Sequence, residues 1–223
     1  LGLHFLLYFC IHYTFLIKKS NMKKLVILSL MAWAMGASLV SCTEEKAAAP
    51  APAQEVNVSE VVVNNIMARR SIRKYTDQTV GSDTLKQILE CGINAPNGMN
   101  KQNYEVKVVD DPASVAYLAE NVKGLYKAPV YIFIAAGSQY DMSQIDCGLL
   151  SANICLSAQA FGLGTCNLGG PIRSLKENPE LLAKLGFGEE YELCLALSLG
   201  HPAESPEAKP RNAEKVQFVK IAE

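Results

Sequence analysis

Four cationic side chains and one hydroxyl lie close together in the sequence between residues 69 and 74. They are Arg69, Arg70, Ser71, Arg73 and Lys74. Arginine presents a planar fork of donors that matches the oxygens of a phosphate, and a serine hydroxyl can add one more hydrogen bond. A second cation pair, Lys209 and Arg211, stands near the other end of the chain. These residues predict a site that holds a phosphate between two distant segments of one domain.

Cations at residues 69–74 also have an ordinary explanation. The apolar spacing directly before them predicts a helix over Val58–Ala68, with Asn57 or Ser59 as a suitable N-cap. Arginine or lysine at the end of a helix complements the helix dipole without binding any ligand. The phosphate interpretation therefore depends on the residues between the two cationic clusters.

A loop rich in turn formers and side-chain amides follows the second predicted helix, which Gly81-Ser82-Asp83 opens and which we expect over Thr84–Asn94. The loop reads Ala95-Pro96-Asn97-Gly98-Met99-Asn100-Lys101-Gln102. Side-chain amides donate and accept together, as the edge of a pyrimidine-like ring requires. They bond equally well within their own loop, so both interpretations stay open.

A glycine-rich run, Gly-Leu-Gly-Thr-Cys-Asn-Leu-Gly-Gly-Pro, occupies residues 162–171. It is not a dinucleotide fingerprint, because the glycine spacing differs and we expect the run to end a helix instead of opening one. It is not a P-loop either, because no Gly-Lys-Ser/Thr follows. Its glycines would let the backbone approach a flat ligand closely. A helix C-cap followed by a turn is the alternative.

The remaining predicted elements alternate between helices and strands at irregular intervals. We expect strands over Tyr104–Val109, Pro129–Ala136 and Tyr191–Leu199, and helices over Pro112–Asn121, Gln144–Phe161 and Pro179–Leu185. The last helix is the second half of a helical pattern that starts at Ser174 and that Pro179 interrupts. The helix over Gln144–Phe161 is apolar almost all round, so it needs burial by a core or by a partner subunit. The pattern predicts an α+β fold with a central sheet packed among helices.

The composition narrows the class of protein. The chain has 223 residues, a formal net charge of −1 and 49% hydrophobic residues, which permits one ordinary domain with a core. Near-neutral charge argues against a nucleic-acid binder. Two of the seven cysteines, Cys10 and Cys42, precede the domain. The odd number that remains, without a Cys-x-x-Cys pair, argues against a disulfide framework or a zinc site. With His201 as the domain's only histidine, a His-based triad is poorly supported.

The N-terminal region has the pattern of an export signal. Met22-Lys23-Lys24 starts a charged region, an apolar stretch follows over 25–40, and Leu39-Val40-Ser41-Cys42 resembles a bacterial lipobox. We expect a signal peptide over 22–41, an acylated Cys42, and an Ala/Pro-rich spacer over 42–56. The domain over 57–223 would then belong to a membrane-anchored lipoprotein outside the cytoplasm, on the periplasmic or cell-surface side. An uncleaved anchor helix is the alternative.

Residues 1–21 carry another apolar run and do not begin with Met. We expect them to be translated from upstream of the true start at Met22. A two-segment membrane hairpin is the alternative.

The order of the motifs resembles the FMN-dependent nitroreductase family over essentially all of residues 57–223. The motifs are Arg-Arg-Ser-x-Arg, Ala-Pro-x-Gly-x-Asn-x-Gln, an apolar helix with Asp146 and Asn153, Gly-Leu-Gly-Thr-Cys-x-x-Gly-Gly, and finally Gly-x-Pro with Lys-x-Arg. The resemblance implies a nitroreductase-like α+β fold with a central, mostly antiparallel sheet. It also implies a homodimer formed through the long helix, with FMN bound at the subunit interface.

The same resemblance assigns residues to the cofactor. The phosphate and ribityl chain would be held by Arg69, Arg70, Ser71 and Arg73, completed by Lys209 and Arg211. The flavin would be lined by Pro96, Asn97, Gly98, Asn100 and Gln102. Leu168, Gly169 and Gly170 would lie near the reactive face, with a backbone N–H toward flavin N5. No catalytic side chain and no metal is then expected, since the flavin carries the chemistry.

Two positions depart from the family pattern. Asn103-Tyr104 stands where many members have Pro-Trp, and Asn167 stands where they often have Trp. The single tryptophan, Trp33, lies in the signal segment. These positions border the substrate side, so the departures concern substrate choice more than flavin binding. The domain is also short, and we expect a relatively open flavin.

The implied activity is transfer of hydride from NAD(P)H, or another donor, through flavin N5 to an electron-poor acceptor such as a nitroaromatic or a quinone. NAD(P)H is a cytoplasmic reductant, whereas an acylated Cys42 would place the domain outside, so a membrane quinol or a partner protein is an alternative donor. The competing hypothesis is a membrane-tethered flavin-binding electron carrier or redox sensor without substrate turnover. A structural lipoprotein that has lost the cofactor is a third possibility.

Overall fold

The computed structural model describes residues 56–222. The expectations for residues 1–55, which include the signal peptide over 22–41 and the lipid on Cys42, lie outside the described residues. Among residues 56–222, no helix has both the length and the hydrophobicity that a membrane crossing requires. The same residues contain no group of three or more His, Cys, Asp or Glu side chains arranged for a metal ion.

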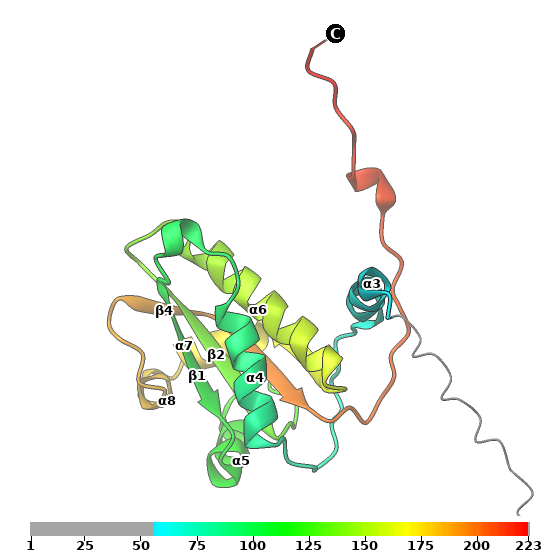
Figure 1. Ribbon diagram of the computed structural model, residues 1–223. Helices are drawn as coiled ribbons and strands as arrows, with labels where there is room; N and C mark the ends of the chain where they lie inside the picture. The colour runs from blue at the N-terminus through cyan, green and yellow to red at the C-terminus, as the bar shows by residue number, and fades with distance from the viewer. Residues whose placement is uncertain (1–55, 223) are drawn as a thin grey trace, which may run out of the picture. The chain divides into compact units, whose positions relative to one another are not determined.

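A four-stranded antiparallel sheet lies at the centre of the fold, in the order β1-β2-β4-β3 (Figure 1). Its strands are β1 (Tyr104–Val109), β2 (Val130–Gly137), β3 (Gly164–Leu168) and β4 (Tyr191–Gly200). Every residue of β2 is buried, because helices cover both faces of the sheet. The predicted α+β fold with a central antiparallel sheet is confirmed.

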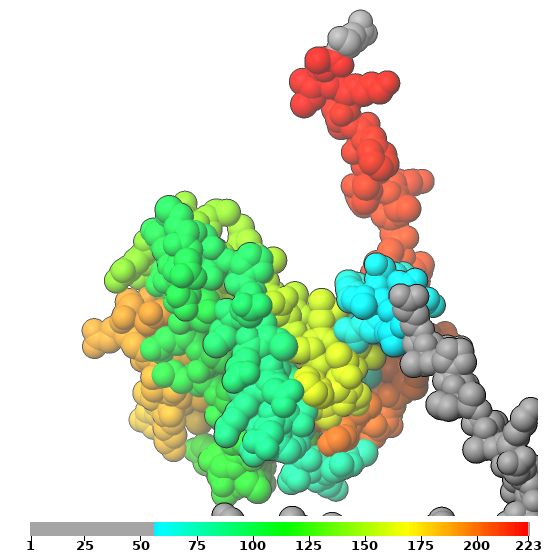
Figure 2. Space-filling view, in the orientation of Figure 1, coloured from blue at the N-terminus to red at the C-terminus, as the bar shows by residue number. Residues whose placement is uncertain are grey.

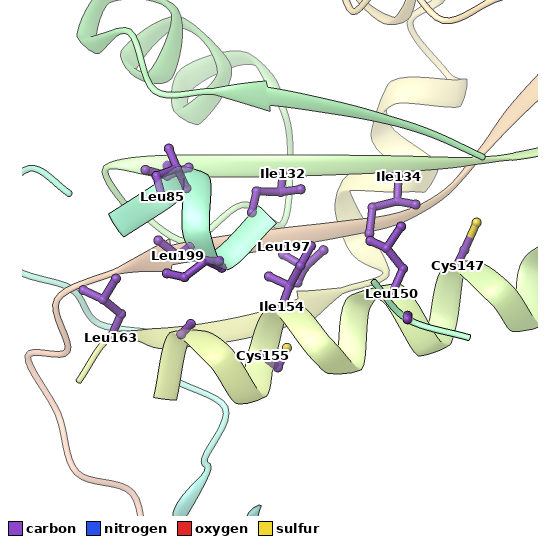
Figure 3. Close-up of a cluster of buried hydrophobic side chains, with 14 of the residues drawn as sticks. Leu85, Ile132, Ile134, Cys147, Leu150, Ile154, Cys155, Leu163, Leu197 and Leu199 are labelled. Atoms are coloured by element: carbon purple, nitrogen blue, oxygen red, sulfur yellow. The ribbon is translucent and has the colours of Figure 1, made fainter. Parts of the chain in front are cut away.

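The helices divide between the two faces of the sheet. They are α3 (Val58–Ala68), α4 (Ser82–Ile93), α5 (Pro112–Asn121), α6 (Ser143–Ala160), α7 (Gly170–Lys176) and α8 (Pro179–Lys184), with short 3-10 turns η2 (Gly98–Asn100) and η3 (Ala213–Lys215). Helices α4 and α6 share one apolar cluster with the sheet, while α5, α7 and α8 share the other. Side chains alternate along β2, so Ile132 and Ile134 face α6 (Figure 3) whereas Tyr131 and Phe133 join the opposite cluster.

Most predicted elements are confirmed, and three of them, α3, β1 and α5, have the predicted bounds. Asn57 caps α3, since its side-chain oxygen accepts the backbone N–H of Glu60 at 3.3 Å. Asn178 caps α8 in the same way by accepting from Leu181 at 3.2 Å. Local pattern and capping residues therefore located these elements correctly.

The glycine-rich run is where the prediction was wrong. Gly162, with a φ of 71°, does follow the end of α6, as the alternative of a helix C-cap predicted. The next residues form β3, however, and Gly170 then begins α7, so the run opens a helix as well as ending one. The physical reason is tertiary, because pairing with β4 from Gly164 to Leu168 satisfies the backbone of a segment with weak strand propensity.

Backbone pairing brings the two ends of the described chain together. Ser71 forms a parallel bridge with Thr165 of β3, and the N–H of Ile72 donates to the Thr165 carbonyl at 2.9 Å. On its other side, the N–H of Thr76 donates to the His201 carbonyl at 2.9 Å. The segment 71–76 therefore lies between β3 and the chain that leaves β4.

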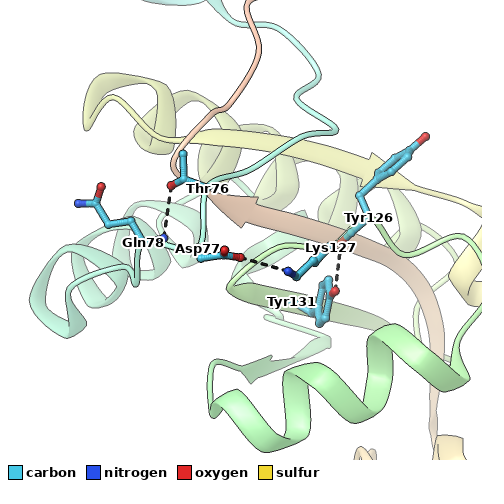
Figure 4. A network of polar contacts seen from close by, with 6 residues as sticks. All are labelled: Thr76, Asp77, Gln78, Tyr126, Lys127 and Tyr131. Carbon is cyan, nitrogen blue, oxygen red and sulfur yellow. Dashed lines mark hydrogen bonds and ion pairs between the residues drawn. The ribbon is translucent and has the colours of Figure 1, made fainter.

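Polar contacts continue this segment toward the start of β2 (Figure 4). The ammonium of Lys127 lies 3.2 Å from a carboxylate oxygen of Asp77, and the Tyr131 hydroxyl donates to the Tyr126 carbonyl at 3.0 Å. Both members of the ion pair are highly exposed, so the pair contributes little to stability. The position of the segment therefore depends mainly on the backbone pairing described above.

Candidate functional site

Residues from both ends of the described chain line a hollow of about 110 Å³, which we call the cationic hollow. Its walls are Arg69, Arg70, Ser71, Arg73, Pro206, Glu207, Lys209 and Arg211. Five of these eight residues are cationic and only Glu207 is acidic. A concave site with this excess of positive charge and guanidinium donors suits a phosphate dianion. The structure therefore brings together the two cationic clusters that the sequence singled out.

Glu204 holds the C-terminal segment against the N-terminal one. One carboxylate oxygen of Glu204 accepts the backbone N–H of Arg73 at 2.5 Å and that of Lys74 at 3.2 Å. The N–H of Ala203 also donates to the Lys74 carbonyl at 2.9 Å. The chain is thus fixed beside residues 71–76 shortly before it reaches Lys209, which explains why distant cations converge.

The guanidinium groups contact backbone carbonyls. Arg70 donates to the carbonyls of Met67 at 2.6 Å and Arg69 at 2.9 Å, and Arg73 donates to that of Ser71 at 3.1 Å. No ion pair in the described part of the chain involves an arginine. Their charge is therefore not neutralised by a carboxylate partner. For Arg70, which bonds the last turn of α3, the helix-end interpretation holds as well.

A second hollow of about 260 Å³ adjoins the cationic hollow and shares Arg69 and Ser71 with it. We call it the α6 hollow, because its other walls are Ala152, Cys155 and Leu156 of α6, together with Asn167 of β3. The side-chain oxygen of Asn167 lies 2.8 Å from the Ser151 hydroxyl, which fixes the amide. The α6 hollow offers apolar and amide surface directly beside the phosphate-type site.

Burial raises the pKa of the Cys155 thiol and also that of Cys166, the residue next to Asn167. Both thiols therefore remain protonated at neutral pH, and neither is an activated nucleophile. These two thiols therefore do not supply a nucleophile to the site.

Helix α3 flanks the α6 hollow. It lies beside the C-terminal half of α6 (Figure 2), and the side-chain amide of Asn65 donates to the Leu156 carbonyl at 2.9 Å. None of the residues of α3 is buried, although the helix carries several large apolar side chains. Most of its apolar surface is thus left uncovered within one chain.

Leu168, Gly169 and Gly170 follow Asn167 directly and so continue from the wall of the α6 hollow. Leu168 is buried, whereas both glycines are exposed. A Cβ atom added at Gly169 would meet nothing within 4 Å, while one at Gly170 would lie 3.4 Å from the Cα of Gly124. The backbone is therefore open to a ligand at Gly169 and packed at Gly170.

The amide loop over 96–102 lies at the other end of α6. The N–H of Gly98 lies 3.2 Å from each carboxylate oxygen of Asp146, in the first turn of α6. The side-chain oxygen of Asn97 accepts the N–H of Gln102 at 3.0 Å, so the loop is partly bonded to itself. The self-bonded interpretation thus holds for Asn97.

Backbone strain marks the same loop. Met99, Asn100 and Gln102 have positive φ angles of 52°, 52° and 48°. No other non-glycine residue within 56–222 has a positive φ angle. Each such residue costs on the order of 1 kcal/mol or more, and strain of this kind concentrates at binding sites. The strain therefore favours a functional role for the loop.

Within one chain, the amide loop does not join the cations. Neither the cationic hollow nor the α6 hollow is lined by a residue of 96–102. The predicted site residues therefore form two groups, one built on 69–73 and 209–211 and the other on 96–102. Leu168, Gly169 and Gly170 line neither hollow and adjoin the first group only through Asn167. If both groups contact one ligand, the amide loop must come from a second copy of the chain.

Sequence reasoning missed the roles of several residues that shape these groups. Asp146 stood in the motif series without an assigned role, and in the structure its carboxylate holds the amide loop at Gly98. Asn167 and Cys155 line the α6 hollow, although the sequence showed Asn167 only as a departure from a pattern. Glu204 gave no signal, because its role depends on the backbone N–H groups of a segment far away in the sequence.

Comparison with known proteins places the chain in a family. The family model described as "Putative TM nitroreductase" matches residues 61–222. Among curated relatives, the FMN reductase (NAD(P)H) of Bacillus subtilis (strain 168) is 29% identical over 176 residues, which are 67% of this chain and 69% of that protein. The NADPH-flavin oxidoreductase of Vibrio harveyi is 27% identical over 168 residues, with the same coverage of 67% and 69%.

Solved structures agree with the sequence comparison. A nitroreductase with bound FMN from Desulfitobacterium hafniense DCB-2 is 25% identical, with a TM-score of 0.62 and coverage of 71% of this chain and 98% of that chain. An FMN-dependent nitroreductase from Clostridium difficile R20291 is 26% identical, with a TM-score of 0.60 and coverage of 71% and 99%. Fold, motif order and family model coincide over the described residues. The chain therefore belongs to the nitroreductase family.

Proposed function

We propose that this chain is an FMN-dependent oxidoreductase that takes hydride from NAD(P)H and reduces a small electron-poor acceptor such as a nitroaromatic or a quinone. The observation that carries the proposal is the cationic hollow, where the segments around Arg69 and Arg211 converge beside the α6 hollow. The relatives named FMN reductase and NADPH-flavin oxidoreductase support the same chemistry.

The residues of the two hollows fit this cofactor. Arg69, Arg73, Lys209 and Arg211 would neutralise its phosphate, and Ser71 would add a hydroxyl donor. The exposed backbone at Gly169 leaves space for a flat ring. When bound, FMN supplies hydride acceptance and donation at its N5 atom. The protonated Cys155 thiol of the α6 hollow would not compete as a nucleophile.

The amide loop completes the site in a homodimer. Asn97, Asn100 and Gln102 of the second copy would give the ring edge its donors and acceptors. The exposed apolar surface supports this assembly, because Ile145 is 54% and Leu149 40% exposed on α6. A helix that is apolar on the outer face as well as the inner one requires a partner there.

The N-terminal sequence supports a membrane-anchored location outside the cytoplasm for this activity. We propose that residues 22–41 are a signal peptide and that Cys42 carries a lipid, which would anchor the domain outside the cytoplasm through the spacer over 42–56. The test is incorporation of labelled palmitate in the producing bacterium. We expect label on the wild-type chain and none on the Cys42→Ala variant. Equal labelling of both would contradict the anchor.

The second candidate function follows from this location. A domain outside the cytoplasm lacks access to NAD(P)H, so a membrane-tethered flavin carrier or redox sensor is the alternative. Its electrons would come from a quinol or a partner protein. The lipobox-like sequence before Cys42 is the observation that favours it.

A visible absorption spectrum separates the two functions. The purified chain loaded with FMN is titrated without oxygen, first with NADH or NADPH and in a parallel sample with a reduced quinone. Bleaching by a nicotinamide, followed by recovery of colour with a nitroaromatic, supports the enzyme. Bleaching by the quinol alone supports the carrier. A colourless protein that FMN does not reconstitute contradicts both functions.

A further inference from the structure

A hydroxyl group is buried in the apolar part of β4. It belongs to Ser198, which is completely buried and has apolar residues on both sides in the sequence. A buried hydroxyl needs a hydrogen-bond partner, because an unpaired one costs free energy. The Ser198 hydroxyl oxygen lies 2.8 Å from that of Tyr75, a residue of the segment 71–76. A polar contact therefore joins β4 to the segment that gives Ser71 and Arg73 to the cationic hollow.

The hydrogen bonds of Tyr75 have a direction. Its hydroxyl oxygen lies 2.5 Å from the Ile72 carbonyl oxygen, which can only accept, so Tyr75 donates its proton there. The Ser198 carbonyl lies farther away, at 3.3 Å. The Ser198 hydroxyl must then donate to the Tyr75 oxygen. Burial raises the pKa of Tyr75, so its hydroxyl stays protonated and remains a donor. Ser198, Tyr75 and Ile72 thus form a chain of hydrogen bonds, which we call the tyrosine relay.

The tyrosine relay ends at a peptide group that is also held on its other side. The Ile72 carbonyl belongs to the peptide group between Ile72 and Arg73. The N–H of the same group, on Arg73, donates to a carboxylate oxygen of Glu204 at 2.5 Å. A trans peptide group is planar, and its carbonyl and N–H point in opposite directions. The two contacts therefore fix its orientation, since a reversed peptide group would lose both and would turn its carbonyl oxygen toward the carboxylate.

This peptide group lies between two residues of the cationic hollow. Ser71 and Arg73 line the hollow, whereas Ile72 between them is only 7% exposed. Ile72 packs closely against β3, because a Cβ atom added at Gly164 would lie 2.5 Å from its side chain. The directions in which Ser71 and Arg73 leave the backbone depend on the orientation of the peptide groups that flank Ile72. The tyrosine relay therefore helps to aim a hydroxyl and a guanidinium at the hollow.

We propose that Tyr75 is a positioning residue of the cationic hollow and makes the protein selective for a phosphorylated flavin over an unphosphorylated one. This inference rests on the proposed function, because it assigns the phosphate of FMN to the hollow. Tyr75 does not line the hollow itself and acts through the peptide group between Ile72 and Arg73. Without the Tyr75 hydroxyl, that group keeps only its contact with Glu204 and is free to rotate. The side chains of Ser71 and Arg73 then lose their fixed directions.

Tyr131 offers a matched control for Tyr75. Both rings pack in the apolar cluster that the sheet shares with α5, α7 and α8. The Tyr131 hydroxyl donates to the Tyr126 carbonyl at 3.0 Å, so it too bonds a backbone carbonyl. Replacing either tyrosine with phenylalanine removes one hydroxyl and keeps the ring. Both variants lose one hydrogen bond to a backbone carbonyl, but only Tyr75→Phe releases the segment 71–76.

The test compares the affinities for FMN and for riboflavin, which lacks the phosphate. The Kd of each flavin is measured by fluorescence titration of the full chain as wild type, Tyr75→Phe and Tyr131→Phe. For Tyr75→Phe, we expect the Kd for FMN to rise about tenfold, the scale of one weakened charge-assisted hydrogen bond. Its Kd for riboflavin should stay at the wild-type value. Tyr131→Phe should keep the wild-type ratio of the two Kd values.

Two results would overturn the role of Tyr75 alone. One is a Tyr75→Phe chain with the wild-type ratio of the two Kd values. The other is an equal change of this ratio in Tyr131→Phe, which would indicate a general effect of the core.

If Tyr75→Phe does not fold, Ser198→Ala takes its place, because it removes the first donor of the tyrosine relay and keeps Tyr75. We expect a smaller change of the ratio in the same direction, and an unchanged ratio would overturn the inference. A wild-type chain that binds FMN no better than riboflavin would refute the phosphate site of the proposed function, and the inference with it. That result is seen before any substitution is made, so the two failures are distinguishable.

Discussion

At the scale of single residues, the cationic hollow depends on side chains whose positions are set by backbone contacts. Glu204 and the bridge from Ser71 to Thr165 place the segments, and the arginines then converge with donors available to an anion. The protein's own backbone contacts therefore hold the two walls of the hollow in place. Such preorganisation reduces the entropy that binding must spend on ordering side chains.

Arg69 is the cationic residue that lines both hollows. In the Arg69→Ala variant, we expect the Kd for FMN to rise about 10–100-fold, because a charge-assisted hydrogen bond to a phosphate contributes about 1.5–3 kcal/mol. The measurement is a titration of FMN fluorescence. Arg173→Ala, which removes an exposed arginine on α7, is the matched control and should bind FMN as wild type does. Equal affinity in both variants would contradict the assignment.

Asp146 holds the amide loop through its contact with Gly98. It is only 5% exposed, and its carboxylate accepts the N–H of Gly98. Asp146→Ala leaves that N–H without its partner, so we expect a loss of about 1–3 kcal/mol in the free energy of unfolding. Asp146→Asn keeps an acceptor and should lose less. Urea unfolding measures both, with exposed Asp141→Ala as the control. An Asp146→Ala chain as stable as wild type would refute this role.

At the scale of secondary-structure elements, the sequence predicted those that local chemistry specifies. Helix α5 illustrates this, because Pro112 suits its first turn and Asp111 caps it. Strand β3 and helix α7 were not predicted, because their glycines indicated a turn. The structure of β3 depends on its pairing with β4. The cationic cluster was visible in the sequence for the same local reason. The walls that α6 and β3 give to the α6 hollow were not visible, because only the tertiary fold brings Asn167 to Cys155.

The cap of α5 gives a pH-dependent prediction. The Asp111 carboxylate accepts the N–H of Ser114 at 2.9 Å, and this bond lowers its pKa in the folded chain. A depressed folded pKa adds stability above the unfolded value of about 3.9, and this stability is lost as the pH falls through the folded pKa. Asp111→Ala should therefore melt about 2–5 °C lower at pH 7.

The same difference should vanish in acid, once Asp111 is protonated in both states. Thermal unfolding followed by circular dichroism between pH 7 and pH 2 measures it. The neighbouring variant Asp110→Ala removes an exposed carboxylate that accepts no capping bond and should show no such trend. A melting difference for Asp111→Ala that stays constant with pH would exclude the cap as its cause.

At the scale of the whole molecule, the two groups of site residues and the uncovered apolar surface point to the same assembly. Helix α3 exposes Val61, Val62 and Ile66, and α6 exposes Ile145 and Leu149. Exposed apolar surface of this extent is typical of an interface. The proposed homodimer would cover it and would also supply the amide loop to the partner's cations.

A charge on the outer face of α6 tests this assembly. We expect the wild-type chain to have twice the chain mass by light scattering, and Ile145→Asp to have the mass of one chain and to lose FMN. The reason is that a carboxylate in an apolar interface is left without a partner. Tyr117→Glu places the same kind of charge on α5 and should stay dimeric. A wild-type monomer that retains FMN would rule out the shared site.

The convergence of residues 69–73 with 209–211 has a consequence for biosynthesis. A ribosome makes the first group early, but the hollow has no second wall until Lys209 and Arg211 have emerged. If the hollow holds the nucleotide as proposed, capture must wait until Lys209 and Arg211 have been translated, and the residues before them begin to fold without the cofactor.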